Sequence, residues 1–378
     1  YIKSFPVDET TGLPTVTAEN SPYGTVDYVG RITQTTGESA NDVVIYYTND
    51  VHTYIDGTIS YDNIAWLKQN TEAADVLLVD AGDHIQGTAY GSMDKGKTII
   101  DLMNAAGYDL ATLGNHEFDY GMDGHINVTD VWAQFPYVSA NFYHEENGVV
   151  GETVLDAYKV FETANGLKIA VIGITTPETF TKSTPAYFQN ENGEYIYGIA
   201  GGEDGQALYD AVQAAIDAAE AEADLVIALA HLGDDPASMP WTSEEVIANT
   251  TGLDALIDGH SHSTVPYKEV ADADGNTVVL TQTGEYFGAI GRMTINTEDL
   301  SIATGLITYD VIEDENEEVI DSYIALDGAK TGWDITPDAA VAEIKDAWIA
   351  KLEEELGKVI GYSEVDLKIK DADGNRLI

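Results

Sequence analysis

Five short motifs in this sequence carry histidine, carboxylate or amide side chains that can bind a metal ion. Each motif follows an apolar run with the composition of a buried strand. In chain order, the motifs are Asp50-Val51-His52, Gly82-Asp83, Gly114-Asn115-His116-Glu117, His231 and Gly259-His260-Ser261-His262. Imidazoles, carboxylates and an amide oxygen together suit Zn, Mn or Fe, whereas an all-oxygen set would favour Mg or Ca. The motifs therefore predict a metal centre of the first kind.

A pair of divalent ions fits this set of ligands. Two ions held about 3.5–4 Å apart need a shared ligand, and a carboxylate with two oxygens, such as Asp83, is suited to bridge them. Bound divalent ions lower the pKa of water from about 15.7 toward 7, which makes hydroxide available at neutral pH. A hydroxide that bridges both ions would attack phosphorus in line while the ions neutralise the phosphate oxygens. The chemistry indicated is the hydrolysis of a phosphoester.

Each of these residues also has a purely structural interpretation when it is taken alone. A single aspartate after a strand is commonly a helix or turn cap, which applies to Asp50 and to Asp83. His231, inside LVIALAHLG, has the surroundings of a core histidine. Once His52 and the motif from Gly259 to His262 are considered with them, capping becomes a minor alternative.

Three further histidines and one glutamate are expected to have other roles. His84, next to Asp83, is expected to take part in local packing or loop structure and not to bind metal. His125 and His144 lie in polar stretches and are predicted to be surface residues. Glu117 is expected to orient neighbouring groups of the metal site, as residues around metal ligands often do.

The segments that must position the motifs alternate between strand-like and helix-like patterns. Apolar, strand-like runs occupy residues 43–48, 76–80, 110–113, 169–174, 225–230 and 254–258. Helical patterns occupy residues 60–73, 97–106 and 205–223. Such alternation predicts a layered α/β fold. In open α/β sheets ligands gather beyond the carboxyl ends of the strands, so motifs that are far apart in the sequence can meet there.

The segment after His262 has a different pattern. Shorter alternating, hairpin-like pieces occupy residues 265–270, 277–282, 290–296 and 305–312. We expect these pieces to form a second sheet that closes the sandwich.

The motifs and their order resemble the calcineurin-like metallophosphoesterase superfamily and, within it, the bacterial 5′-nucleotidase and UDP-sugar hydrolase family. The resemblance spans residues 41–335 and implies a four-layer α/β/β/α sandwich with the motifs at the C-terminal ends of strands. It also implies two divalent metal ions, Zn, Mn or similar. One ion would be bound by Asp50, His52, Asp83 and His262, and the other by Asp83, Asn115, His231 and His260.

The segment LGNHEFDYG resembles the part of the family that carries its catalytic pair. The resemblance implies that His116 and Asp119 lie near the substrate phosphate without binding a metal, and that Asn115 and His116 contact this phosphate. His116 can give a proton or positive charge to the leaving alkoxide, and Asp119 can hold the imidazole in the useful tautomer. Related cyclic-nucleotide phosphodiesterases often carry asparagine in place of Asp119, so its carboxylate favours the 5′-nucleotidase branch.

Composition restricts the partners of the chain. The 17 basic and 66 acidic residues give a formal net charge of −49, which argues against a nucleic acid polymer or an anionic lipid surface as partner. A small phosphate ester would instead be attracted by the local charge of the metals. The acidic surface is expected to keep the chain soluble, or to suit a high-salt or Ca²⁺-rich extracellular setting.

The apolar share and the absence of cysteine set further bounds. A hydrophobic share of 44% is ample for a core, and no run of apolar residues is long enough to predict a membrane span. With no cysteine in the sequence, a disulfide framework and thiolate metal ligands are excluded. We expect an extracellular, cell-surface or periplasmic protein, although no export signal is visible.

Four segments are expected along the chain. Residues 1–40 contain the turn signals TTG, NSPYG and TTGES and are predicted to be an N-terminal extension with at most one strand near 28–35. Residues 41–335 would form the catalytic domain, and residues 336–357 a linker helix that starts with Thr336 as N-cap and Pro337 at the first position and ends at Gly357.

In the resembling family, such a helix leads to a C-terminal domain that carries nucleoside-stacking aromatics and phosphate-binding arginines. Residues 358–378 are expected to be the start of that domain, cut off after its first strand. The nucleoside-binding residues are therefore expected outside this chain, on a specificity domain joined in cis.

Together, the motifs and the resemblance predict a metal-dependent phosphoester hydrolase, a 5′-nucleotidase that releases phosphate from nucleoside monophosphates. Two alternatives use the same core, a 2′,3′-cyclic-nucleotide phosphodiesterase and a UDP-sugar hydrolase, and hydrolysis of a sulfur ester is a third. An alternative of another class is a surface metal-binding or adhesion module without turnover. The pair of His116 and Asp119 argues against such a module, which has no need of it.

Overall fold

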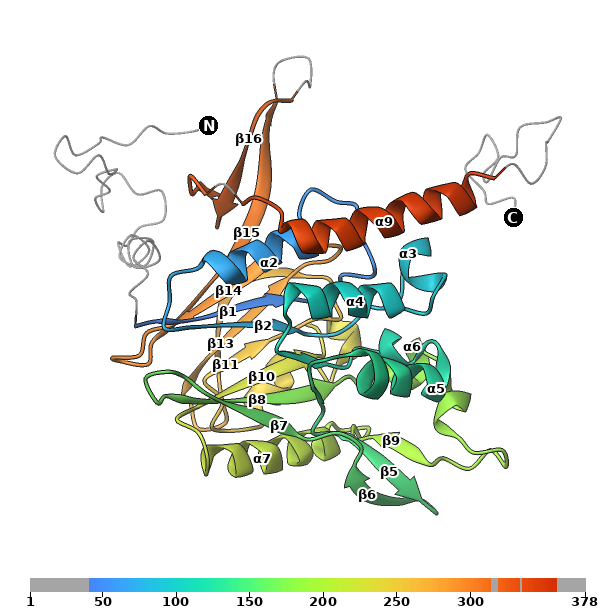
Figure 1. The fold of residues 1–378 in the computed structure, drawn as a ribbon. Coiled ribbons are helices and arrows are strands. Elements are labelled where there is room, and N and C mark those ends of the chain that lie inside the picture. Colours follow the sequence, from blue (N-terminus) through green and yellow to red (C-terminus); the bar gives the residue numbers. More distant parts are fainter. Residues whose placement is uncertain (1–40, 314–318, 334, 359–378) are drawn as a thin grey trace, which may run out of the picture.

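Two large β-sheets stack face to face between outer helices in the part of the chain that the structure describes (Figure 1). This computed structural model describes residues 41–313, 319–333 and 335–358. On one side the sandwich is covered by helices α2 (Tyr61–Asn70), α4 (Lys97–Ala106) and α9 (Ala339–Leu356), and on the other by α7 (Gln206–Glu220). The predicted α/β/β/α sandwich is confirmed.

The first sheet has eight strands in the order β17-β16-β15-β14-β1-β2-β3-β4. They are β1 (Val43–Thr48), β2 (Asp75–Asp80), β3 (Leu110–Thr112), β4 (Tyr137–Val138), β14 (Ile290–Ile295), β15 (Ile302–Glu313), β16 (Val319–Leu326) and β17 (Ala329–Lys330). Strands β1 to β4 are parallel, and Thr48 at the end of β1 pairs with Asp80 at the end of β2. The loops that follow these two strands therefore start at the same level.

The second sheet has six strands in the order β12-β13-β11-β10-β8-β7. They are β7 (Tyr158–Glu162), β8 (Lys168–Thr175), β10 (Leu225–His231), β11 (Ala255–Ile257), β12 (Thr264–Ala271) and β13 (Thr277–Thr283). Strands β8, β10, β11 and β13 are parallel, whereas β7 and β12 are antiparallel edge strands. His231 is the last residue of β10 and pairs with Thr175 at the end of β8.

Smaller elements complete the described part of the fold. Strands β5 (Phe142–Glu146), β6 (Val149–Thr153) and β9 (Tyr197–Ile199) form a separate sheet. The remaining helices are α3 (Ala89–Ser92), α5 (Gly121–Ile126), α6 (Thr179–Lys182) and α8 (Ser243–Ala248), and short helical turns are η1 (His116–Phe118), η2 (Asn127–Trp132), η3 (Pro185–Phe188) and η4 (Pro236–Ser238). Among the described residues, no helix has the length and apolar composition needed to cross a bilayer.

The core follows from the alternation of side chains along the central strands. In β1, Val43, Ile45 and Tyr47 point between the two sheets, while Val44 and Tyr46 pack on the side of α2 and α4. All six residues of β1 are buried, as is usual for a parallel strand that is covered on both faces. The ends of this strand are thus fixed from two sides, which holds the loop after it in one place.

The predicted elements are largely confirmed, but the hairpin-like pieces do not form one sheet. Strands β12 and β13 join the second sheet through β11, and β14 and β15 join the first through β1. The expectation of a single closing sheet was therefore wrong. Local alternation identifies a strand, but it does not say which of two open sheet edges the strand will occupy.

Helix α9 starts later than predicted. Its N-cap is Asp338, whose side-chain oxygen accepts hydrogen bonds from the backbone N–H groups of Ala340 and Val341, both at 3.0 Å. A carboxylate that takes two free N–H groups caps a helix well, so the predicted start at Thr336 was wrong. The predicted end is confirmed, with Gly357 as C-cap. The expected strand near 28–35 and the segment 359–378 lie outside the described residues.

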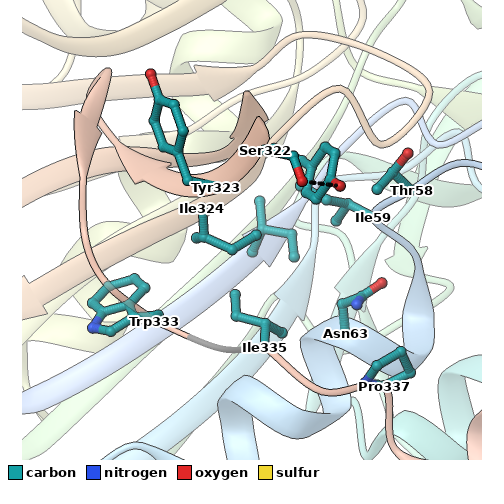
Figure 2. A pocket seen from close by; sticks show the side chains of 11 residues that line it. Thr58, Ile59, Asn63, Ser322, Tyr323, Ile324, Trp333, Ile335 and Pro337 are labelled. Atoms are coloured by element: carbon teal, nitrogen blue, oxygen red, sulfur yellow. Dashed lines mark hydrogen bonds between the residues drawn. The ribbon is translucent and has the colours of Figure 1, made fainter. Parts of the chain in front are cut away.

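A pocket of about 310 Å³ lies beside the strand pair β15 and β16 and is lined mainly by apolar side chains. Figure 2 shows Ile324 of β16 facing Ile59 and Ile335, with Trp333 at one side. None of the five motifs lines this pocket. The predicted metal ligands lie elsewhere, beyond the ends of the parallel strands.

Candidate metal centre

The structure brings all five motifs together beyond the carboxyl ends of β1, β2, β3, β10 and β11. The loops after β1 and β2 are joined by two backbone hydrogen bonds, from Asp50 N to Gly82 O at 3.0 Å and from His52 N to Asp83 O at 2.9 Å. This convergence is the one expected for parallel strands whose ends are level.

Close contact between the loops requires glycine at two positions. A Cβ atom at Gly114 would lie 2.2 Å from Asp83 Oδ1, and one at Gly259 would lie 2.9 Å from Asp50 Oδ2. Neither glycine has a positive φ. At Gly114 and Gly259 glycine is therefore required by the lack of space beside a carboxylate, and not by the backbone conformation.

Five of the predicted ligand residues have a left-handed backbone conformation. Their φ angles lie between 47° and 80°, and they are Asp50, His52, Asp83, His260 and His262. For residues other than glycine this conformation costs on the order of 1–3 kcal/mol each and is concentrated at functional sites. The fold therefore holds these side chains in place at the expense of stability.

Three overlapping groups of side chains among the described residues could each hold a cation. One consists of His52, Asp83 and His116, and the other two match the two predicted ligand sets. The ligand atoms of Asp50, His52 and His262 lie within 4.8 Å of one another, and the same limit holds for Asp83, His231 and His260. Asp83 lies between these two groups, because its Oδ2 atom is 3.1 Å from His231 Nε2 and 3.8 Å from His52 Nε2. A carboxylate shared in this way is the arrangement that a pair of nearby metal ions needs.

Every histidine of the two predicted ligand sets has one ring nitrogen directed at an oxygen outside the cluster. His52 Nδ1 lies 3.0 Å from the carbonyl oxygen of Gln86, and His231 Nδ1 lies 2.7 Å from that of Ala81. His260 Nε2 lies 2.7 Å from Glu178 Oε2, and His262 Nδ1 contacts Glu285. A ring nitrogen that donates its proton outward leaves the other nitrogen with a lone pair for a metal.

Several atoms in the site are unsatisfied without a cation. The Nε2 atoms of His52 and His262 are only 3.1 Å apart. In the tautomers in which both rings carry their proton on the outer nitrogen, both Nε2 atoms present a lone pair to the same space. Asn115 Oδ1 is buried and has no hydrogen-bond partner, and the buried His231 Nε2 has only Asp83 Oδ2 close to it, at 3.1 Å. Buried polar atoms without partners are costly. Two divalent cations would satisfy these atoms, so the residues present fit the metal ions that the resemblance implies.

The electrostatics of the cluster also favour positive charge. Burial acts to lower the pKa of His231, but the charges of Asp83 and Asp50 outweigh it and raise this pKa to about 10. Burial likewise acts to raise the pKa of Asp83, yet the surrounding imidazoles bring it well below its ordinary value. The carboxylate of Asp83 is therefore ionised at neutral pH and attracts cations.

His116 and Asp119 form a pair beside the cluster. The short turn η1 places them three residues apart on one side, with His116 Nδ1 at 2.5 Å from Asp119 Oδ2. Ser183 Oγ donates to Asp119 Oδ1 at 2.9 Å, and His116 N donates to Asp83 Oδ1 at 2.8 Å. Burial acts to lower the pKa of His116, but the hydrogen bond to Asp119 and the charge of Asp83 raise it to about 9.

The sequence matches a protein family whose members carry out the chemistry that this geometry suggests. The model of the calcineurin-like phosphoesterase family matches residues 43–264, which include all five motifs. The chain belongs to this family. Members of the family hydrolyse phosphoester bonds with the help of divalent metals, so the predicted superfamily and the predicted class of enzyme are confirmed.

Two relatives of this phosphoesterase have known activities. A 5′-nucleotidase of Diplobatis ommata is 32% identical over 246 residues, which cover 58% of this chain and 37% of the relative. A 2′,3′-cyclic-nucleotide 2′-phosphodiesterase/3′-nucleotidase of Salmonella typhimurium is 28% identical over 288 residues, which cover 70% of this chain and 41% of the relative. The chain thus spans less than half the length of these two relatives.

The fold is also that of a solved structure. The calcineurin-like phosphoesterase YfkN from Bacillus subtilis superposes with a TM-score of 0.61 at 23% identity, covering 84% of this chain and 99% of that chain. At this identity the similarity shows the fold of the phosphoesterase and nothing about its substrate.

Glu117 and His84 support the loops of the phosphoesterase without facing the cluster. Glu117 is fully buried, and its two oxygens accept hydrogen bonds from the backbone N–H groups of Asp83 at 2.8 Å, Gly114 at 2.6 Å and His84 at 3.0 Å. The His84 ring lies between Asp80 Oδ1 and the hydroxyl of Tyr137, 2.8 Å from each. Both residues hold neighbouring groups, as expected from the sequence.

Two glutamates of the site were missed in the sequence. Glu178 follows β8 and Glu285 follows β13, and each contacts the outer nitrogen of one histidine of the Gly259 to His262 motif. The hydrogen bond from His260, aided by Ser238, lowers the pKa of Glu178 to about 2 against the effect of burial. A signal was present, because Glu178 lies just beyond the end of a parallel strand, as the five motifs do.

Replacing Glu178 with glutamine is expected to weaken metal binding by roughly 10- to 100-fold, the usual effect of losing a carboxylate that orients a ligand. A glutamine amide can present its N–H group to His260 and so disturb the tautomer that leaves the other ring nitrogen free. Calorimetric titration of the metal-free protein with Mn²⁺ measures the effect, with the exposed Glu162→Gln as control. An unchanged affinity in the Glu178 variant would contradict this role.

The prediction that His125 is a surface residue was wrong. Its side chain is 2% exposed and stacks on Phe118, with ring centroids 4.8 Å apart, while its Nδ1 atom is buried without a hydrogen-bond partner. Its polar sequence neighbours concealed the buried face of the short helix α5. His144, in contrast, is exposed as predicted.

The burial of His125 has a consequence for stability at low pH. Burial lowers its pKa from 6.5 to about 4, so below pH 6.5 the unfolded chain takes up a proton that the folded chain does not. The free energy of unfolding therefore decreases as the pH falls from 6.5 to about 4. The full decrease is about 3 kcal/mol, at 1.36 kcal/mol per pKa unit. Urea unfolding of the metal-free protein should show a smaller loss between pH 7 and 4 for His125→Phe than for the unsubstituted chain. Equal losses would contradict the assignment.

Proposed function

We propose that this phosphoesterase is a 5′-nucleotidase that releases phosphate from nucleoside monophosphates at a dinuclear metal centre. The observation that carries the proposal is the pair of ligand groups that share Asp83, with His116 and Asp119 directly beside them. A metal-binding module without turnover would need the ligands but not the adjacent pair of His116 and Asp119.

The proposed ligands of the two ions correspond to two of the groups of side chains described above. Asp50, His52, Asp83 and His262 would hold one ion, and Asp83, Asn115, His231 and His260 the other. When bound, such ions supply hydroxide at neutral pH and neutralise phosphate oxygens. Asn49 donates to Asp50 Oδ2 at 2.7 Å, and the backbone N–H of His260 is shared between Oδ2 at 2.9 Å and Oδ1 at 3.2 Å. Oδ1 also lies 3.4 Å from His262 Nε2.

The reacting phosphate would be contacted by Asn115 and His116. With a pKa of about 9, the imidazole of His116 is protonated at neutral pH. It can stabilise the negative charge that develops on the leaving oxygen, or give that oxygen a proton. Asp119 holds Nδ1 and so keeps the ring oriented, and Ser183 in turn holds Asp119.

Two observations bear on the substrate. The aspartate at 119 and the similarity to the 5′-nucleotidase of Diplobatis ommata favour a nucleoside 5′-monophosphate. The similarity to the Salmonella typhimurium enzyme favours the second candidate, a 2′,3′-cyclic nucleotide. The division of the chain at residues 41–335, 336–357 and 358–378, and a location outside the cytoplasm, stay predictions.

The test of the proposal is a substrate panel with the chain supplied with Mn²⁺ or Zn²⁺. We expect kcat/KM for AMP to exceed that for 2′,3′-cyclic AMP, UDP-glucose and a sulfur ester. A higher kcat/KM for the cyclic nucleotide would establish the second candidate. Metal binding without turnover of any ester would support the binding module instead.

A further inference from the structure

Two exposed tyrosines stack on each other at the edge of the candidate metal centre. Their rings belong to Tyr54, in the loop after β1, and to Tyr286, in the loop between β13 and β14, and their centroids are 4.1 Å apart with planes at 28°. Tyr54 is 38% exposed and Tyr286 is 39% exposed. Exposed aromatic rings of this kind are ready-made surfaces for a planar ligand.

The pair is in direct contact with the candidate ligands of the first ion. The ring of Tyr286 meets the rings of His52 and His262 edge-on, with centroids 5.7 Å away in both cases. A group attached to a phosphate held at these histidines would therefore reach the tyrosines. In a nucleotide only the sugar separates the phosphate from the base.

The loop that carries Tyr286 is held in a costly conformation. Tyr286 and the next residue, Phe287, have φ angles of 59° and 56°, which is unusual for bulky side chains. Tyr286 N donates to the carbonyl oxygen of Asp50 at 2.9 Å, and Phe287 is buried against Tyr61 with centroids 4.9 Å apart. Strain that the surrounding structure maintains in this way is typical of functional positions.

Space is available next to Tyr54, in a hollow that Tyr286 does not itself line. The hollow, of about 520 Å³, lies between Tyr54, helix α3 and the end of α9, and it is lined by Tyr90 and Leu352 as well. This volume is in the range of small-molecule sites. The carboxylates of Asp56 and Glu353 also line it, so it can accept hydrogen bonds from amino or hydroxyl groups and repels additional phosphates.

We propose that Tyr54 and Tyr286 form a stacking surface for the planar group of the leaving alcohol, which for a nucleotide is its base. This inference rests on the proposed function for the identity of that group, but not for the contact itself. It places part of the substrate recognition within the described residues, in addition to any recognition that a further domain supplies.

The test compares substrates with and without a ring. Tyr286→Ala and Tyr54→Ala are expected to lower kcat/KM for AMP and for p-nitrophenyl phosphate by roughly 5- to 100-fold, the scale of one lost stacking contact. The kcat/KM for ribose 5-phosphate, which has no aromatic ring, should fall by less than that for the two ring-bearing substrates. Tyr286→Ala removes a neighbour of His52 and His262, but with this substrate no stacking contact is lost. Tyr286→Phe keeps the ring and should recover most of the loss seen with alanine.

The controls separate a binding role from a structural one. Tyr309→Ala removes a tyrosine of similar exposure, 38%, on β15, where it bonds to Ser322, and should not alter the ratio between AMP and ribose 5-phosphate. Equal losses for all three substrates, or no loss for any, would overturn the proposal. If AMP is not a substrate at all, the 5′-nucleotidase proposal fails, while p-nitrophenyl phosphate against ribose 5-phosphate still tests the stacking surface.

Discussion

Replacing Asp83 with alanine is expected to remove both metal ions and to abolish phosphoester hydrolysis. The purified chain should bind close to two equivalents of Mn²⁺ or Zn²⁺, whereas the variant should retain far less than one. The reason is that Asp83 Oδ2 lies between the two ligand groups, so that its loss weakens both at once. Elemental analysis of the purified proteins measures the result.

A matched control distinguishes the loss of a shared ligand from general damage. Asp272 is also a buried aspartate, 7% exposed against 2% for Asp83, but it lies in the turn between β12 and β13, where it accepts backbone hydrogen bonds. Asp272→Ala should keep both metal ions even if it unfolds at lower temperature. Two tightly bound ions in Asp83→Ala would show that this carboxylate is not the bridge.

Replacing His116 with alanine is expected to leave the metal content unchanged and to lower the turnover of a phosphomonoester by roughly 10²- to 10⁴-fold, the usual effect of removing a positioned acid. His116 forms a possible ligand group with His52 and Asp83, but its Nδ1 is hydrogen-bonded to Asp119 and its backbone N–H donates to Asp83. Stopped assays with AMP, together with elemental analysis, separate the two effects.

Asp119→Asn should change turnover in the same direction as His116→Ala but by less. The imidazole remains, and what is lost is the charge that raises its pKa and the acceptor that holds its tautomer. If His116→Ala lost both metal and activity, His116 would be a metal ligand. The proposed role of His116 and Asp119 in stabilising the leaving group would then be wrong.

The cluster is ordered largely by groups that do not face a cation. Backbone carbonyls of Gln86 and Ala81 and the carboxylates of Glu178 and Glu285 each fix one imidazole. Glu117 fixes the backbone of Asp83 from the opposite side. Because these groups set the tautomers and the ring directions before a metal arrives, they lower the cost of assembling the centre.

The residue types in the five motifs indicate divalent-metal chemistry before any tertiary contact is known. Residues such as Asp50, His52 and His262 are of types that bind divalent metals. Each follows an apolar run that is predicted to be a buried strand. The position of a ligand at the end of a parallel strand is a local property, because strand and motif are adjacent in the chain. For this reason the five motifs and the alternation of strands and helices could be recognised without coordinates, while the ligand set stays a prediction.

How those residues are oriented depends on contacts between segments that are far apart in the sequence. The oxygen that fixes His260 comes from Glu178, the stacking partner of Tyr286 is Tyr54, and His125 is buried against Phe118 and Phe142. The hairpins that follow the last motif divide between the two sheets. Local sequence carries the period of a strand or a helix, but such contacts arise when distant elements pack, and packing depends on which surfaces and sheet edges remain uncovered in the whole fold.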